Sequence, residues 1–124
     1  MIKIDCIYIK NSSSFGQFIA PWVQERNLNS SDYLNKTEEA DDGIDGIVIF
    51  SENQEIDRET EEIKNAFDRR QKPVHKIDIN GTLMVAISNL DVWLESNRCK
   101  KVLFVGDDSL VKNPNLERLF THLH

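Results

Sequence analysis

The segment Asp45-Gly46-Ile47-Val48-Ile49-Phe50-Ser51 is the strongest indication of the architecture of this chain. Four large apolar residues run without interruption between a glycine and a serine. Such a run is typical of a β-strand whose two faces are both covered by other parts of the protein. A polar loop follows, and the pattern then predicts a helix from about Arg58 to Arg70, which gives the strand-loop-helix unit of an α/β fold.

The same alternation of strands and helices extends over the rest of the chain. The patterns predict strands at 2–9, 47–50, 74–79 and 101–105, and helices at about 15–26, 58–70, 83–96 and from 114 onward. In the helix at 83–96 the recurring apolar residues are Leu83, Val85, Ala86, Leu90, Trp93 and Leu94. We therefore expect one Rossmann-like α/β domain over residues 1–124, a three-layer sandwich with a parallel sheet of four or five strands and helices on both faces.

Three segments do not fit the regular pattern. Pro21 lies inside the first helix, which predicts either a kink or a later helix start. Residues 27–32 are rich in Asn and Ser and are predicted to be a loop. Residues 107–113 are predicted to be a polar loop, in which Asp107, Asp108 and Ser109 either cap the final helix or form the rim of a ligand site. Tyr33-Leu34 is either a very short strand or a loop packed on the sheet. Residues 36–42 form either a single helical turn or, in the acidic run at 38–42, a solvated loop.

Composition excludes several classes of partner. The chain has 124 residues, of which 40% are hydrophobic and 29% charged, and its formal net charge is -6. Nucleic acids and anionic membrane surfaces are bound through basic surfaces, so we expect neither as a partner. No apolar run approaches the ~20 residues that span a bilayer, and the first residues do not form a secretory signal, so we expect a cytoplasmic protein. The sequence leaves a homo-oligomer open.

Cysteine and histidine form no recognisable site pattern. Cys6 and Cys99 lie far apart without metal-ligand spacing, and we expect reduced thiols. His75 falls within a predicted strand and is expected to be structural, as are Trp22 and Trp93 on apolar helix faces. We therefore expect no metal site.

Loops that follow parallel strands meet at one edge of the sheet, where open α/β folds bind ligands. Three such loops stand out, at 10–16, 51–60 and 106–113. A phosphate cradle needs glycines there, but only Gly16 and Gly106 are available. The loop before the helix at 58–70 is acidic, which suits a helix N-terminus but repels phosphate. The serines at 12–14 either cap a helix or donate hydroxyls to a ligand.

A set of family motifs has counterparts at 7–16, 36–38, 45–47 and 57–60. Together these segments resemble the putative molybdenum cofactor carrier family, in the SLOG branch of Rossmann-like nucleotide-binding domains. Where that family has a strand followed by Gly-Gly-Gln-Thr-Gly-Val-Asp, this chain has Ile7 to Ile9 followed by Lys10-Asn11-Ser12-Ser13-Ser14-Phe15-Gly16. The family's Arg-Thr-Glu segment and Asp-Gly-Thr strand are similar to Lys36-Thr37-Glu38 and Asp45-Gly46-Ile47. Its Gly-Gly-Thr loop is matched by Asp57-Arg58-Glu59-Thr60.

The resemblance continues to the end of the chain. Lys72-Pro73-Val74 to Asp78 resembles the family's Lys-Pro strand, and Phe104-Val105-Gly106-Asp107-Asp108-Ser109 resembles its Asn-Val-Ala-Gly-Pro-Arg-Glu-Ser loop. Pro114 begins a closing helix in both. The family implies a nucleotide-like, molybdopterin-type or other phosphate-bearing ligand, held here by Ser12, Ser13, Ser14, Gly16, Ser51, Thr60, Gly106, Asp107 and Ser109. Both glycine loops have lost their glycines, so we expect altered or lost binding and no catalysis.

A second resemblance gives an alternative function. The strand at 47–51, the helix with Glu62-Ile63 and Ala66, and Lys72-Pro73-Val74 are similar to the middle of TIR domains and nucleoside deoxyribosyltransferases. In those enzymes a glutamate early in the helix acts on a ribosyl centre, and Glu62 is the nearest match, with Glu59 and Glu61 as neighbouring carboxylates. An N-glycosidic-bond-cleaving enzyme and a protein-interaction domain with a decayed pocket are therefore the two alternatives to a ligand-binding domain.

Overall fold

A parallel sheet forms the centre of the molecule. The structure is a computed structural model that describes residues 4–10, 12–26, 29–32 and 44–123. Within these ranges, five strands pair in the order β2-β1-β5-β3-β4, and every pairing is parallel. The strands are β1 (Cys6–Ile9), β2 (Asn29–Asp32), β3 (Gly46–Ser51), β4 (Val74–Asp78) and β5 (Lys101–Gly106). The predicted parallel α/β fold is therefore confirmed.

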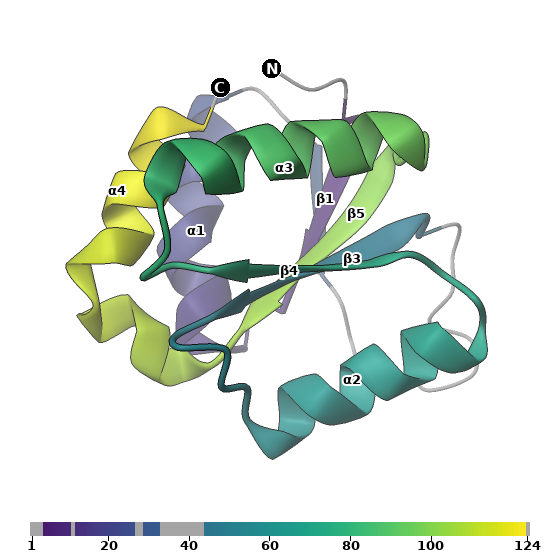
Figure 1. Ribbon diagram of the computed structural model, residues 1–124, viewed down its shortest axis with the longest axis horizontal. Coiled ribbons are helices and arrows are strands. Elements are labelled where there is room, and N and C mark those ends of the chain that lie inside the picture. Colours follow the sequence, from purple (N-terminus) through teal and green to yellow (C-terminus); the bar gives the residue numbers. More distant parts are fainter. Residues whose placement is uncertain (1–3, 11, 27–28, 33–43, 124) are drawn as a thin grey trace.

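Helices cover both faces of this sheet (Figure 1). They are α1 (Ser14–Glu25), α2 (Arg58–Arg69), α3 (Leu83–Ser96) and α4 (Pro114–His122), with a short 3-10 helix η1 (Asp108–Lys112) before α4. In Figure 1, α2 lies below the sheet, whereas α3 lies above it and α1 and α4 lie at its left. Helix, sheet and helix make the three layers of a Rossmann-like sandwich.

Strand β3 shows why the stretch at 45–51 carries the fold. All six of its residues are buried. Ile47 and Ile49 belong to the cluster that packs against α2, and Val48 and Phe50 belong to the larger cluster on the other face. Successive side chains of a strand point to opposite faces, so an uninterrupted apolar run is what two covered faces require.

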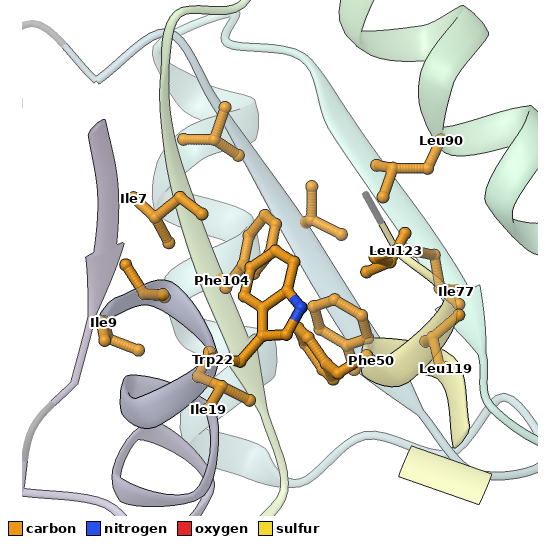
Figure 2. Close-up of a cluster of buried hydrophobic side chains, with 14 of the residues drawn as sticks. Ile7, Ile9, Ile19, Trp22, Phe50, Ile77, Leu90, Phe104, Leu119 and Leu123 are labelled. Atoms are coloured by element: carbon orange, nitrogen blue, oxygen red, sulfur yellow. The ribbon is translucent and has the colours of Figure 1, made fainter. Parts of the chain in front are cut away.

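The larger cluster is built around aromatic rings, several of which are drawn in Figure 2. The ring centroid of Phe50 lies 5.5 Å from that of Phe15, 5.3 Å from Phe104 and 5.2 Å from Phe120. Trp22 of α1 meets Phe120 of α4 edge to face at 5.0 Å. Each such pair adds about 0.5–1.5 kcal/mol beyond the burial of its apolar area. This packing joins α1 and α4 to the centre of the sheet.

The last strand to be made lies in the middle of the sheet. β5 pairs with β1 on one side and β3 on the other, with Ile9 opposite Phe104 and Phe50 opposite Gly106. The carboxyl ends of β1, β5 and β3 therefore lie next to one another, and the loops that follow these strands share one edge of the sheet.

Three predictions were wrong. The expected loop at 27–32 contains β2, because the backbone of residues 29–32 pairs with β1 and an edge strand tolerates the polar sequence Asn-Ser-Ser-Asp. The expected loop at 107–113 contains η1, which buries Leu110. Val85 was expected with the inward residues of α3 but is 54% exposed, as are Met84 and Val92 to similar extents.

The remaining predictions about elements are settled in part. Helix α1 begins at Ser14 and contains Pro21, so the alternative of a later start is wrong. Ser13 begins the helix as its cap, since its Oγ accepts a hydrogen bond from the Gly16 N–H. The expectations for Tyr33, Leu34 and residues 36–42 lie outside the described residues.

Candidate functional site

The three loops come together in a pocket at the carboxyl edge of the sheet. We call it the Lys10 pocket, and it is lined by Lys10, Ser13, Asp57, Glu59, Thr60, Ile63, Phe104, Val105, Gly106 and Asp108. These residues come from the loop after β1, the start of α2 and the end of β5. Parallel pairing places them together, and the position corresponds to the crevice where open α/β sheets bind ligands.

The pocket is small. The space inside it that water can reach is about 30 Å³. A cavity needs about 10–15 Å³ of such space for one water molecule, so this pocket has room for about two. It therefore accommodates one compact chemical group and leaves any larger part of a ligand outside its mouth.

An ion pair crosses the pocket. The ammonium of Lys10, directly after β1, contacts the Oε1 atom of Glu59 in the first turn of α2. The Lys10 side chain is 16% exposed, whereas that of Glu59 is 55% exposed. The lysine is thus a largely desolvated cation, and its partner is a carboxylate that still reaches solvent.

Two further carboxylates line the pocket and are fixed by backbone hydrogen bonds. Asp57 caps α2, and its Oδ1 accepts from the Thr60 N–H at 2.8 Å. Asp108 Oδ1 accepts from the Phe15 N–H at 3.1 Å and so ties η1 to the start of α1. The pocket therefore carries one ammonium and three carboxylates. Within the described residues, Asp57 and Asp108 accept hydrogen bonds from backbone N–H groups, whereas Glu59 contacts only the Lys10 side chain.

Packing explains why glycines occur at 16 and 106. A Cβ atom on Gly16 would lie 2.1 Å from the Lys10 carbonyl oxygen, a backbone atom that cannot move away cheaply. A Cβ atom on Gly106 would lie 2.9 Å from side-chain atoms of Leu110 and Phe15. Both glycines allow parts of the protein to approach closely, and this requirement holds with or without a ligand.

The structure brings together only some of the residues suggested by the sequence. Ser13, Thr60 and Gly106 line the Lys10 pocket, and Gly16 lies beneath the Lys10 carbonyl. The other suggested residues, which do not line it, are Ser12, Ser14, Ser51, Asp107 and Ser109.

Four of the suggested residues outside the pocket make hydrogen bonds or ion pairs within the fold. The buried Ser51 hydroxyl donates to the Ile77 carbonyl at 3.2 Å, which links β3 to β4. Asp107 Oδ1 accepts from the Ser109 N–H and caps η1. The candidate catalytic residue Glu62 has a 66% exposed side chain, pairs with Arg58 at 3.4 Å and does not line the pocket.

Lys10 was missed as a candidate from the sequence. The usable signal was its position, because a charged residue directly after a buried strand points into the carboxyl edge of the sheet. Asp57 was noticed only as a member of an acidic loop, and Asp108 was considered as part of a loop that either caps the final helix or forms a ligand rim. Glu59 was considered beside Glu62, and the structure places Glu59 in the pocket.

A second polar group lies at the same edge, after β3 and β4. We call it the amide cluster, and it consists of Asn53, Asp78, Asn80, Asn113 and Asn115. Asp78 Oδ1 accepts from the backbone N–H groups of Asn53 and Asn80, at 3.1 and 2.9 Å. The side chain of Asn80 bonds to those of Asn53, Asn113 and Asn115 at 2.8–3.1 Å. These groups satisfy one another and join three loops.

Two side chains outside the Lys10 pocket and the amide cluster, His75 and Cys99, have pKa values that differ from their ordinary values. His75 on β4 stacks on Trp93 of α3 at 5.2 Å, and burial lowers the pKa of its imidazole. Burial, together with the nearby Asp45 carboxylate, raises the pKa of the Cys99 thiol to about 11. A protonated thiol is a poor nucleophile and a poor metal ligand, so Cys99 is chemically quiet at neutral pH.

Two searches of the described ranges found nothing. Between residues 4 and 123, leaving out the gaps given above, no three His, Cys, Asp or Glu side chains are grouped so that they could hold a metal ion. In the same ranges, no helix combines the length and the apolar character needed to cross a bilayer.

Comparisons with known proteins agree with the fold. The chain is a Rossmann-like α/β sandwich. The crystal structure of a "Putative molybdenum carrier protein" from Syntrophus aciditrophicus SB has the same fold. The two superimpose with a TM-score of 0.77 over 96% of each chain, with 15% sequence identity. At this identity the likeness shows the fold alone. No family model matches the sequence, and no curated protein matches it.

Proposed function

We propose that this protein is a non-catalytic ligand-binding domain that holds the anionic group of a small molecule against Lys10. The observation that carries this proposal is the Lys10 side chain, only 16% exposed, which lines a pocket at the carboxyl edge of a parallel sheet. Keeping a cation largely away from water is costly unless an anion accompanies it. The partner of Lys10 in this structure, Glu59, has a 55% exposed side chain, so it can turn into solvent and let another anion take its place.

The pocket dimensions limit what is held inside. About two water molecules fit, so the anionic group enters and the rest of the ligand lies across the mouth. Nucleotide-like and molybdopterin-type ligands both carry such a group, and the name of the structural neighbour describes a carrier, which is a binding role. These are the ligand classes that we propose for this chain.

Calorimetric titration tests the proposal with NAD, ADP-ribose, ATP, GMP and molybdopterin. We expect at least one to bind the wild-type protein and to lose about tenfold or more in affinity with Lys10→Gln, because a charge-assisted contact is removed. Lys64→Gln is the matched control, since Lys64 also belongs to an ion pair, with Asp68 at 2.9 Å, but lies outside the pocket.

Two outcomes contradict the proposal. Silence across the whole panel favours the alternative of a protein-interaction domain with a decayed pocket. Release of nicotinamide from NAD, or of a base from a nucleoside, favours the N-glycosidic enzyme instead. In that case Glu62→Ala and Glu59→Ala show which carboxylate takes part, because only the latter lines the pocket.

A further inference from the structure

The Lys10–Glu59 ion pair joins two side chains that differ in their freedom to leave. Lys10 follows β1 directly and is largely buried, so separating it from an anion leaves a poorly solvated charge. Glu59 is 55% exposed, and its carboxylate returns to water when it turns away from the pocket. The glutamate is therefore the member of the pair that an incoming anion displaces.

We propose that Glu59 is an internal competitor for the ligand site and that the pocket consequently selects singly charged anionic groups. In the ligand-free protein the Glu59 carboxylate occupies the place on Lys10 that the ligand's anion takes. This inference rests on the proposed function, because it concerns the same site. It adds a self-occupied resting state and a charge preference, neither of which follows from the fold.

When a ligand replaces the Glu59 carboxylate beside Lys10, the net charge of the pocket stays the same only if the ligand's anionic group carries a single negative charge. One carboxylate leaves and one negative charge arrives, so the local balance is unchanged. Asp57 and Asp108 remain, since hydrogen bonds to the Thr60 and Phe15 N–H groups hold them in place. A dianion would add a second negative charge beside these two fixed carboxylates, in a partly desolvated pocket where repulsion is weakly screened.

The selected chemistry is therefore a carboxylate or a singly charged phosphate, such as a phosphodiester, in preference to a phosphate monoester. Among the proposed ligand classes this favours NAD and ADP-ribose, in which each phosphate carries one negative charge, over GMP and molybdopterin, which carry a monoester. An uncharged group cannot replace Glu59, because it leaves the Lys10 ammonium without a counter-charge. The acidic lining therefore discriminates between anions by their charge. Glu59 can move out of the pocket, whereas Asp57 and Asp108 are held in place and repel any additional negative charge.

Two esters of similar size test this inference directly. Dimethyl phosphate carries one negative charge, and at pH 8 monomethyl phosphate carries close to two, because its second pKa is about 6. Both are titrated into the ¹⁵N-labelled protein at constant low ionic strength, and the amide signals of Thr60 and Gly106 are followed. We expect the wild-type protein to bind dimethyl phosphate the more tightly, by about threefold or more.

Variants separate exchange from selection. Glu59→Gln removes the competitor and is expected to tighten dimethyl phosphate binding about tenfold. Glu61→Gln removes the same charge from an exposed position in the same helical turn outside the pocket, and is expected to change binding less than about twofold. Asp108→Asn keeps an oxygen for the Phe15 N–H but removes a fixed charge, so it is expected to narrow the difference between the two esters.

The outcomes distinguish this inference from the proposed function. If the wild-type protein binds dimethyl phosphate and Glu59→Gln behaves like Glu61→Gln, the competitor role is overturned and ligand binding at Lys10 stands. If monomethyl phosphate binds the more tightly, the charge selection is overturned. If neither ester binds the wild-type protein or Glu59→Gln, the proposed function and this inference fail together.

Discussion

The carboxyl edge of the sheet has two polar regions that differ in what their groups already do. In the amide cluster, the Asp78 carboxylate accepts hydrogen bonds from two backbone N–H groups. The Asn80 side chain forms hydrogen bonds with the side chains of three other asparagines. In the Lys10 pocket, the ammonium forms an ion pair with the exposed Glu59 side chain. The pocket also contains space that water can enter. Both regions are polar, and both follow strands of the same sheet.

Polarity at this edge of the sheet does not by itself mark a ligand site. A hydrogen-bonding group that is satisfied by its neighbours has little to offer a ligand, because each new bond must replace an existing one. A desolvated charge with a displaceable partner has more to offer. Substitutions of the side chains that bond to one another in the amide cluster should therefore change stability alone, whereas substitution of Lys10 or Glu59 should change binding.

We expect the largest change in the free energy of unfolding from a glycine beside the Lys10 pocket, and we compare it with a glycine beside the amide cluster. Gly16→Ala places a methyl group against the Lys10 carbonyl oxygen, and we expect a loss of about 3 kcal/mol in the free energy of unfolding. Gly81→Ala meets the Asp78 carbonyl oxygen at 3.3 Å, so we expect a change within about 1 kcal/mol. Urea denaturation measures both. Equal losses would show that the tight approach at Gly16 relaxes freely.

The next effect concerns Asp78. Its carboxylate accepts hydrogen bonds from two backbone N–H groups, so Asp78→Ala is expected to cost about 2 kcal/mol of stability. Asp108→Ala removes one such bond and is expected to cost about 1 kcal/mol. The midpoint of urea unfolding reports both changes. A larger loss for Asp108 would mean that the pocket, and not the amide cluster, is the more rigid region.

A smaller effect tests whether the amide cluster takes part in binding. Asn80→Ala breaks the side-chain bonds to three asparagines, and we expect a loss of about 1 kcal/mol because these groups are exposed and water replaces the partners. Affinity for dimethyl phosphate should stay within about twofold of the wild-type value. A tenfold drop in affinity would unite the two regions into one site.

The smallest effect lies outside both regions. Burial lowers the pKa of His75 in the folded protein below its ordinary value of 6.5, so the unfolded chain takes up the proton first as the pH falls. Stability is therefore fully present above pH 6.5 and declines slightly below it. His75→Phe keeps a ring against Trp93 and should remove this part of the slope between pH 7.5 and 5.5. An unchanged slope would assign it to other groups.

Much of the fold was accessible from the sequence because β3 is covered on both faces, and only that arrangement suits an unbroken apolar run. The strand at 29–32 was not accessible. Its four residues are Asn, Ser, Ser and Asp, which favour loops when judged alone, and its pairing with β1 is a property of the tertiary structure. Val85 was misplaced for a related reason, since α3 is apolar on more than one face and gives a weak periodic signal.

The site was accessible only as a region. Parallel pairing allowed the three loops to be placed at one edge, but no spacing indicates that Lys10 meets Glu59, because the contact depends on how α2 returns over the sheet. The sequence also could not separate Ser13, which lines the pocket, from Ser12 and Ser14, which do not. Their chemistry is identical, and only the start of α1 distinguishes them.

The central place of β5 has a consequence for how the chain is made. Among the residues that the structure describes, the pair β1–β2 and the pair β3–β4 are joined within the sheet only through β5, so they stay separate until residues 101–106 leave the ribosome. Both pairs must therefore wait until residues 101–106 have been made before they can join into one sheet. Supplying residues 101–123 as a separate peptide to a chain that ends at residue 100 would reveal whether one late segment is enough to complete assembly.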